Sequence, residues 1–186
     1  MRVFCAVEIP SEIRVQSAQH IKQLRECFPH VRASWEQAEK MHITLKFLGE
    51  INETELEKLN SAIINTTNNF QPFDISIEMT GAFPPRGVPR VLWLGVNDSV
   101  KSLKTLQNKL DDECAKFGFK KDTRTFHPHL TLARLRSAEG AKALKEKHES
   151  LVFKSEPFTV REIVIMQSEP APTGSHYTKL YQHSLS

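Results

Sequence analysis

Residues 41–50 read MHITLKFLGE, and residues 128–135 read PHLTLARL. Each stretch contains the motif His-x-Thr-Leu, as His42-Ile43-Thr44-Leu45 and as His129-Leu130-Thr131-Leu132. Side chains along a strand alternate between its two faces. Each histidine therefore shares a face with the threonine two residues later, while the apolar neighbours face the core. The two stretches predict two strands that each present one imidazole and one hydroxyl.

The sequence around the two motifs also repeats. The stretch RVFCAV that begins at Arg2 is echoed by RVLWLGV, which begins at Arg90, 88 residues later. His42 and His129 are 87 residues apart, so nearly one register relates both pairs. Between the two halves lies GAFPPRGVP (81–89), whose three prolines and two glycines predict a loop. We interpret the pattern as an internal duplication of about 87 residues.

Helical spacing of apolar residues follows each opening strand and each histidine motif. The predicted helices cover residues 11–28, 52–68, 99–117 and 138–149. We therefore expect an α+β fold in one domain (1–186), with lobe 1 at about 1–80 and lobe 2 at about 90–186. Each lobe is expected to be an antiparallel-rich sheet backed by helices, and a pseudo-two-fold axis would place a cleft between them. The last strands, 158–166 and 176–180, should complete the second lobe.

Some expectations concern single side chains. In the first helix, apolar residues recur at steps of three and should face the sheet: Val15, Ala18, Ile21, Leu24 and Cys27. In the third helix, Val100 belongs to the expected apolar stripe. Five histidines have no partner at a suggestive spacing and are expected at the surface: His20, His30, His148, His176 and His183.

Composition excludes several classes of protein. The 25 Lys and Arg nearly balance the 22 Asp and Glu, so no strong single-sign field dominates the chain. No apolar run approaches the roughly 18 residues that a membrane span needs, and Glu8 interrupts the first apolar stretch, so we expect neither a signal peptide nor membrane contact. The three cysteines are scattered and odd in number, which argues against a disulfide framework and favours a reducing cytoplasm.

Two histidines and two threonines that converge on one cleft suit the cleavage of a phosphodiester. The reaction needs a base for the nucleophile and an acid for the leaving oxygen, and imidazole can be either near neutral pH. Threonine hydroxyls can donate hydrogen bonds to phosphate oxygens on which charge develops. One such motif arises easily by chance, whereas two copies at matching repeat positions favour a functional site.

A metal site is the weaker interpretation of the same region. His127 lies two residues before His129, but no carboxylate or cysteine is spaced to join them and His42 as ligands. The chain also lacks a Gly-x-x-x-x-Gly-Lys loop and a nucleotidyl-transferase lysine motif, which argues against an ATP-driven ligase. We therefore expect no metal and no cofactor.

The sequence resembles the 2H phosphoesterases, and among them the RNA 2',3'-cyclic phosphodiesterases, also called 2'-5' RNA ligases. The resemblance spans nearly the whole chain and is carried by RVFCAVEIP, MHITLKFLGE, GAFPP with PRVLWLGV, and FHPHLTLARL. It implies that His42 and His129 are the catalytic pair, the former as acid and the latter as base. It also implies that Thr44 and Thr131 bind the phosphate.

Two further residues come from the resemblance alone. Arg134 is similar to the family's phosphate-contacting arginine, and Phe47 to an aromatic residue that lines the base pocket. Each lies five residues after its histidine, so an unbroken strand would point it to the opposite face. Both residues require a bend or a strand end.

The resemblance implies that the enzyme hydrolyses 2',3'-cyclic phosphate at an RNA end to a 2'-phosphate, with tRNA fragments among the candidate substrates. The same pair run in reverse would join RNA ends through a 2'-5' bond. Two alternatives stay open: a non-catalytic nucleotide-binding module, and a phosphodiesterase for a small cyclic nucleotide or an ADP-ribose cyclic phosphate. We expect a monomer.

The basic residues near the second motif have two interpretations. Lys120, Lys121 and Arg124 precede that motif, while Arg86 and Arg90 follow the midpoint loop. They form either an ordinary solvated surface or a rim that meets RNA phosphates.

Overall fold

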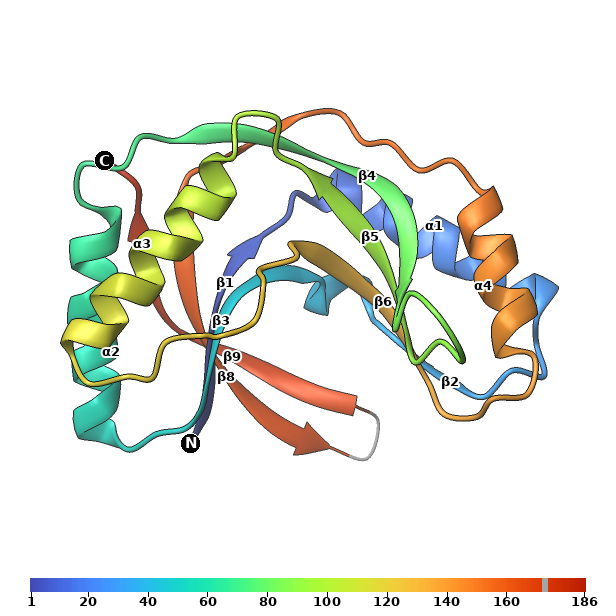
Figure 1. Cartoon of the computed structure of the whole chain (residues 1–186), viewed down its shortest axis with the longest axis horizontal. Helices are drawn as coiled ribbons and strands as arrows, with labels where there is room; N and C mark the ends of the chain where they lie inside the picture. The colour runs from blue at the N-terminus through green and yellow to red at the C-terminus, as the bar shows by residue number, and fades with distance from the viewer. Residues whose placement is uncertain (172–173) are drawn as a thin grey trace.

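A computed structural model describes residues 1–171 and 174–186 and has a mixed α+β architecture (Figure 1). The strands are β1 (Arg2–Glu8), β2 (Ala33–Trp35), β3 (His42–Glu50), β4 (Phe73–Phe83), β5 (Val91–Asn97), β6 (His129–Leu135), β7 (Phe158–Val160), β8 (Glu162–Ala171) and β9 (Gly174–Ser184). The helices are α1 (Ser11–Cys27), α2 (Glu53–Thr67), α3 (Ser102–Lys116) and α4 (Ala141–Ser150), with a short 3₁₀ turn, η1 (Ala38–Lys40). The α+β prediction is confirmed.

The strands form one curled antiparallel sheet in the order β7-β4-β5-β6-β3-β1-β8-β9, with β2 paired to β6 (Figure 1). The two motif strands, β3 and β6, meet at its centre through the pair Ile43 and Leu130. Beyond that point they diverge, and β2 replaces β3 as the neighbour of β6. The sheet therefore has two halves that touch at the two His-x-Thr-Leu motifs.

The halves of the sheet do not coincide with the halves of the chain. We expected the last strands to complete the second lobe, and this is wrong for β8 and β9: β8 pairs with β1, and β9 extends that edge. The first part of the predicted strand 158–166 forms β7, which pairs with β4. The strand before the midpoint loop, β4, pairs instead with β5. Because only residues 84–90 connect β4 to β5, the two strands must be antiparallel neighbours. The free edge of β1 is then available to β8.

The midpoint loop is also shorter than predicted. Strand β4 continues through Gly81 and Ala82 to Phe83, which pairs with Val91, so the loop begins at Pro84. As a result, Phe83 is held on a strand beside the second histidine motif.

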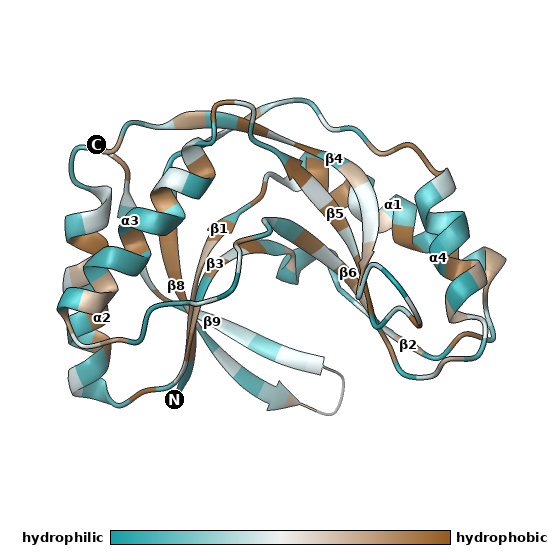
Figure 2. Cartoon of the chain, in the orientation of Figure 1, coloured by the Kyte–Doolittle hydropathy of each residue, from teal (hydrophilic) through white to brown (hydrophobic). Residues whose placement is uncertain are grey.

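The helices pack in two pairs that each draw on both halves of the chain. Helices α2 and α3 lie together at one end of the molecule, and α1 and α4 at the other (Figure 1). Hydrophobic segments follow the central strands and the inward helix faces (Figure 2). The predicted start of α2 is confirmed by a capping box between Asn52 and Glu55. No helix in the described ranges is long and apolar enough to cross a membrane.

Two predicted helix faces are wrong at individual positions, although Ile21 and Leu24 of α1 are buried as expected. In α1, Val15 is 56% exposed and Cys27 is exposed, whereas Ile13 and Ser17 are buried. Steps of three fall about 60° short of a full turn each time, so a stripe at that spacing winds around the helix. In α3, the Asp98 carboxylate accepts hydrogen bonds from the first backbone N–H groups, and the helix starts after Val100, which is exposed.

The expectation that His20 and His148 lie at the surface is also wrong. His20 is 7% exposed on α1 and His148 fully buried on α4, and their rings join the two helices through an Nε2 to Nδ1 hydrogen bond of 2.9 Å. His148 Nε2 donates to the Trp93 carbonyl (3.0 Å), so its Nδ1 accepts from His20. A satisfied hydrogen bond allows two polar rings to be buried between helices.

This histidine pair predicts a loss of stability in acid. Burial lowers the pKa of His20 to about 4 in the folded protein, whereas a histidine in the unfolded chain has a pKa of about 6.5. Between these values the unfolded state binds more protons, so the free energy of unfolding falls as pH decreases, by up to about 3 kcal/mol. Urea unfolding at pH 7 and pH 4.5 measures the loss. His20→Gln should reduce it, His30→Gln at an exposed site should not, and an equal loss in His20→Gln would contradict the assignment.

Candidate active site

A β-bulge in β3 resolves the direction of Phe47. Opposite β1, Thr44 pairs with Ala6 and Lys46 with Cys5, which leaves Leu45 without a partner. Leu45 and Lys46 are consecutive buried residues, and one extra residue reverses the alternation that follows. Phe47 is therefore 60% exposed on the same face as Thr44.

The matching bulge in β6 does the same for Arg134. Opposite β5, Thr131 pairs with Trp93 and Ala133 with Leu92, so Leu132 is unpaired. Leu132 and Ala133 are both fully buried, and Arg134 is then exposed on the face of Thr131. The requirement for a bend is met at equivalent positions of the two motifs.

The motif residues gather around one pocket of about 460 Å³. Ile43 and Leu130 are fully buried beneath it, as the period-two alternation predicted. All six predicted site residues line this pocket: His42, Thr44, Phe47, His129, Thr131 and Arg134. The structure brings these side chains together, whereas their roles stay predictions. A larger groove of about 1050 Å³ lies beside α1 and contains none of the six.

Each imidazole is fixed by the same backbone contact. His42 Nδ1 lies 2.7 Å from the Lys40 carbonyl, and His129 Nδ1 lies 2.7 Å from the His127 carbonyl. A carbonyl oxygen only accepts, so each Nδ1 carries the hydrogen and each Nε2 is left for chemistry. Neutral His42 or His129 can then take a proton at Nε2, and the protonated ring can release one from the same atom.

Burial lowers the pKa of both histidines. For His42, loss of hydration is the largest cause, and the hydrogen bond to the Lys40 carbonyl opposes it. For His129, burial again dominates, and the positive charge of Arg134 adds to the lowering. Both rings therefore favour the neutral form while the pocket holds no phosphate. A bound phosphate anion would raise both pKa values and favour the protonated form.

Aromatic rings that the sequence analysis did not assign to the site hold the imidazoles. Phe4 stacks on His42 with ring centroids 4.7 Å apart, and Tyr177 meets His42 edge-on at 5.3 Å. Phe83 meets His129 edge-on at 5.2 Å. Phe4 and Phe83 lie within the stretches that carry the family resemblance, but Tyr177 is on the β8–β9 hairpin and no local spacing connects it to the motifs.

Glu36 is a further pocket residue that sequence reasoning missed. It follows β2, and its backbone N–H donates to the Leu132 carbonyl (2.8 Å) next to the bulge of β6. Burial raises the pKa of its carboxyl group, and Arg134 acts in the opposite direction.

His127 does not build a metal site with these groups: no cluster of three or more His, Cys, Asp or Glu side chains in the described part of the chain is arranged to hold a metal ion.

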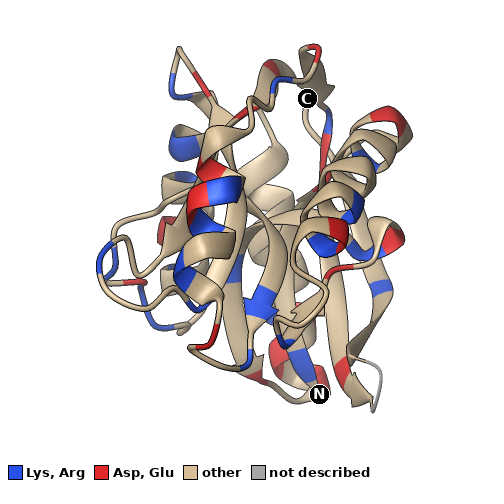
Figure 3. Ribbon diagram, turned by 90° about the vertical axis from the view of Figure 1, so that its right-hand side faces the viewer, with Lys and Arg blue, Asp and Glu red and all other residues tan. Residues whose placement is uncertain are grey.

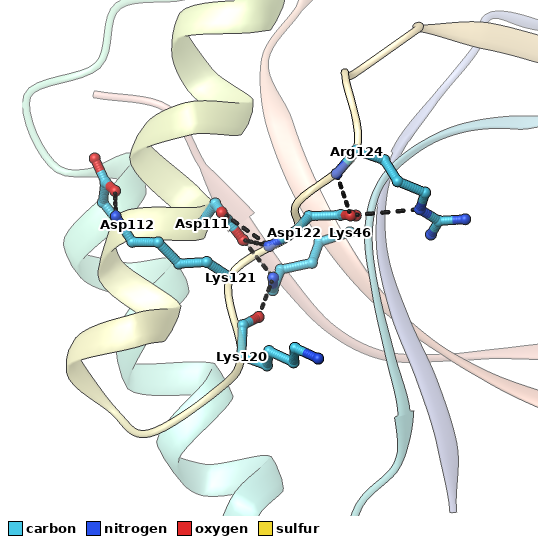
Figure 4. A network of polar contacts seen from close by, with 7 residues as sticks. All are labelled: Lys46, Asp111, Asp112, Lys120, Lys121, Asp122 and Arg124. Atoms are coloured by element: carbon cyan, nitrogen blue, oxygen red, sulfur yellow. Dashed lines mark hydrogen bonds and ion pairs between the residues drawn. The ribbon is translucent and has the colours of Figure 1, made fainter.

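The bulge of β3 also buries a charge below the site. Lys46 is 3% exposed, and its Nζ pairs with the Asp111 carboxylate of α3 and donates to the Lys120 carbonyl (2.9 Å) (Figure 4). Both Asp111 oxygens also accept from the Asp122 backbone N–H at 3.2 Å. This network ties the segment that leads toward His129 to the strand that carries His42.

The comparisons with known proteins agree with this geometry. Residues 10–171 match the family model described as the 2'-5' RNA ligase superfamily. A protein of Archaeoglobus fulgidus named RNA 2',3'-cyclic phosphodiesterase is 36% identical over 181 residues, which cover 97% of this chain and 98% of that protein. A protein of the same name from Methanocaldococcus jannaschii is 32% identical over 180 residues, covering 95% and 96% of the two chains.

Solved structures show the same fold. A protein of Thermus thermophilus superposes with a TM-score of 0.82 at 26% identity, covering 100% of this chain and 98% of the other. Escherichia coli LigT in complex with 3'-AMP gives 0.76 at 26% identity, with the same coverage. A curled antiparallel sheet with paired His-x-Thr motifs at its centre defines the 2H phosphoesterase class. Within that class, the chain belongs to the 2'-5' RNA ligase superfamily.

The buried ion pair predicts a large stability effect. Lys46→Met leaves Asp111 without its cation and should lower the free energy of unfolding by about 3 to 5 kcal/mol, measured by urea denaturation. Lys46→Met with Asp111→Leu should recover most of that loss, because no buried charge is left unpaired. Asp112→Asn, which breaks the exposed pair with Lys121 (2.5 Å), is the control and should change little. A negligible effect of Lys46→Met would show that Asp111 does not depend on Lys46 for its burial.

The aromatic contact predicts a change in the titration of His42. Tyr177→Ala removes a ring that shields the imidazole from water, so the pKa of His42 should rise toward about 6.5. NMR titration of the imidazole protons measures it. Tyr181→Ala is the matched control, because Tyr181 lies on the same strand but its hydroxyl donates to Glu57 (2.9 Å). An unchanged pKa of His42 in Tyr177→Ala would show that Tyr177 does not shield it.

Proposed function

We propose that this chain is an RNA 2',3'-cyclic phosphodiesterase that converts a terminal 2',3'-cyclic phosphate to a 2'-phosphate. The single observation that carries the proposal is the pair of imidazoles in one pocket, each with Nδ1–H bound to a carbonyl and, among the described residues, no hydrogen bond at Nε2. The names of the relatives support the substrate class.

In the proposed hydrolysis, the water oxygen attacks phosphorus while the base takes its proton at Nε2. The bond between phosphorus and O3' breaks, and O3' receives the proton held on Nε2 of the other imidazole. The phosphate is left on O2'. We retain His42 as the acid and His129 as the base, as the family resemblance implies. After one turnover the two rings have exchanged one proton, and proton transfer through water restores them.

The other predicted residues act on the phosphate and the base. Thr44 and Thr131 donate hydrogen bonds to the phosphate oxygens, which gain charge in the transition state. Arg134 adds a cation at the same pocket and Phe47 an exposed ring on which the terminal base stacks. If a 5'-hydroxyl replaces water as the nucleophile, the same steps form a 2'-5' bond between two RNA ends: the base takes the proton of the 5'-hydroxyl, its oxygen bonds to phosphorus, and O3' leaves with the proton of the acid.

We also propose that the protein is a monomer and acts in the cytoplasm. All three cysteines are free, which is compatible with a reducing compartment.

The activity test uses an RNA that ends in 2',3'-cyclic phosphate, incubated in excess EDTA. We expect a 2'-phosphate product at an undiminished rate, because two imidazoles supply both proton transfers. Chromatography against 2'- and 3'-phosphate standards identifies the product. A 3'-phosphate, or activity that disappears with EDTA and returns with a divalent ion, would contradict the mechanism. Binding of the RNA without turnover would favour the nucleotide-binding module.

The lowered pKa values predict the pH profile. One histidine must be neutral and the other protonated, so the plot of rate against pH should be bell-shaped. The apparent pKa values of its two limbs describe the coupled pair and not either histidine alone. Because burial lowers both pKa values in the free enzyme, the optimum of kcat/KM should lie below about 6.5. The optimum of kcat should lie higher, since bound phosphate raises both pKa values. Rates measured from pH 4.5 to 9 test this, and an optimum of kcat/KM above that of kcat would contradict it.

A further inference from the structure

Four arginines lie at the edge of the sheet where β2 and β5 begin and β6 ends. Arg134 is directly opposite Ser34 of β2 and Val91 of β5. The Arg136 backbone N–H donates to the Arg32 carbonyl (2.7 Å), and the Leu135 N–H donates to the Arg90 carbonyl (2.8 Å). The row of positive charge formed by Arg32, Arg90, Arg134 and Arg136 is here termed the arginine row.

The arginine row is exposed to solvent, and Glu36 is a carboxylate that interacts with Arg134. All four side chains are exposed, and among the residues that the structure describes none of the four has an ion-pair partner. The other half of the expected basic rim differs, because Lys121 pairs with Asp112 and Arg124 with Asp122 (Figure 4). Arg90 of that expected rim belongs to the arginine row and has no ion-pair partner among the described residues. Figure 3 turns the end of the molecule that carries α1 and α4 toward the viewer, with basic residues in blue.

The arginine row begins inside the pocket and leads away from it. Arg134 lines the pocket with His129 and Thr131. Arg136 is two residues further along, about 7 Å by strand geometry, and its Nε donates to the Ser34 hydroxyl (2.9 Å). This bond holds the guanidinium beside β2, and Arg32 precedes the same strand.

The space beyond the row can also receive bases. Arg32 and Arg25 line the groove of about 1050 Å³, together with the half-buried ring of Trp35. Glu36 lines both this groove and the pocket, so the two spaces are adjacent. Exposed arginines next to an aromatic ring are a common arrangement for binding single-stranded nucleic acid.

We propose that Arg32, Arg90 and Arg136 bind the backbone phosphates of the RNA strand on the 5' side of the cyclic-phosphate end. The inference rests on the proposed function and extends it from the terminal nucleotide to the strand. Guanidinium groups bind phosphate through paired hydrogen bonds without regard to base sequence. The enzyme would thus prefer an RNA end to a cyclic mononucleotide and would accept many sequences.

The test compares a 2',3'-cyclic mononucleotide with an eight-nucleotide RNA that ends in the same group. The triple variant Arg32→Gln, Arg90→Gln, Arg136→Gln should lower kcat/KM for the RNA about tenfold or more and leave the mononucleotide rate unchanged. The salt slope of log kcat/KM for the RNA should also become shallower by about 2, at about 0.7 for each lost contact. An unchanged mononucleotide rate also shows that the variant is folded.

The control is Lys58→Gln, Lys104→Gln, Arg161→Gln, which removes the same charge from exposed positions on α2, on α3 and before β8. It should retain the RNA rate and its salt slope. Equal losses in both triple variants would show that the arginine row does not bind the RNA strand, and so would a wild-type enzyme that does not distinguish RNA from mononucleotide. Either result would leave the proposed function intact. Wild-type enzyme inactive on both substrates would overturn the proposed function and this inference with it.

Discussion

Ile43 on β3 and Leu130 on β6 pair across the middle of the sheet, and the placement of the site depends on this contact. Both side chains are fully buried, so the residues on either side must face the opposite way. Antiparallel order then brings His42 toward Thr131 and Thr44 toward His129. Two imidazoles and two hydroxyls reach one pocket because two hydrophobic residues share one core.

The bulges extend that constraint along each strand. Leu45 and Leu132 are inserted residues that stay in the core, so Phe47 and Arg134 can return to the pocket face. The two motifs differ at the next residue. Ala133 is an ordinary core residue, whereas the equivalent Lys46 brings a charge that the Asp111 carboxylate balances. The same bulge therefore positions a site residue in both strands and links β3 to α3 in one of them.

The sequence was informative where physical rules act locally. Period-two alternation predicted the faces of His42 and Thr44, and duplication predicted that a second pair would join them. Prediction from the sequence failed where strands far apart in the chain pair with one another. The short connection between β4 and β5 makes these two strands neighbours, which leaves the edge of β1 free to pair with β8. Tyr177 and the buried pair of His20 and His148 were missed for the same reason, since each depends on segments more than 100 residues apart.

The most direct measurement of the central claim compares single-turnover rates of His42→Ala, His129→Ala and the double variant on RNA with a cyclic-phosphate end. Two imidazoles acting as one acid–base pair predict that each single variant loses at least about 10²-fold to 10⁴-fold in rate. The double variant should then be little slower than either single variant, because removal of one partner already disables the pair. Near-wild-type rates in both single variants would contradict the two-histidine mechanism.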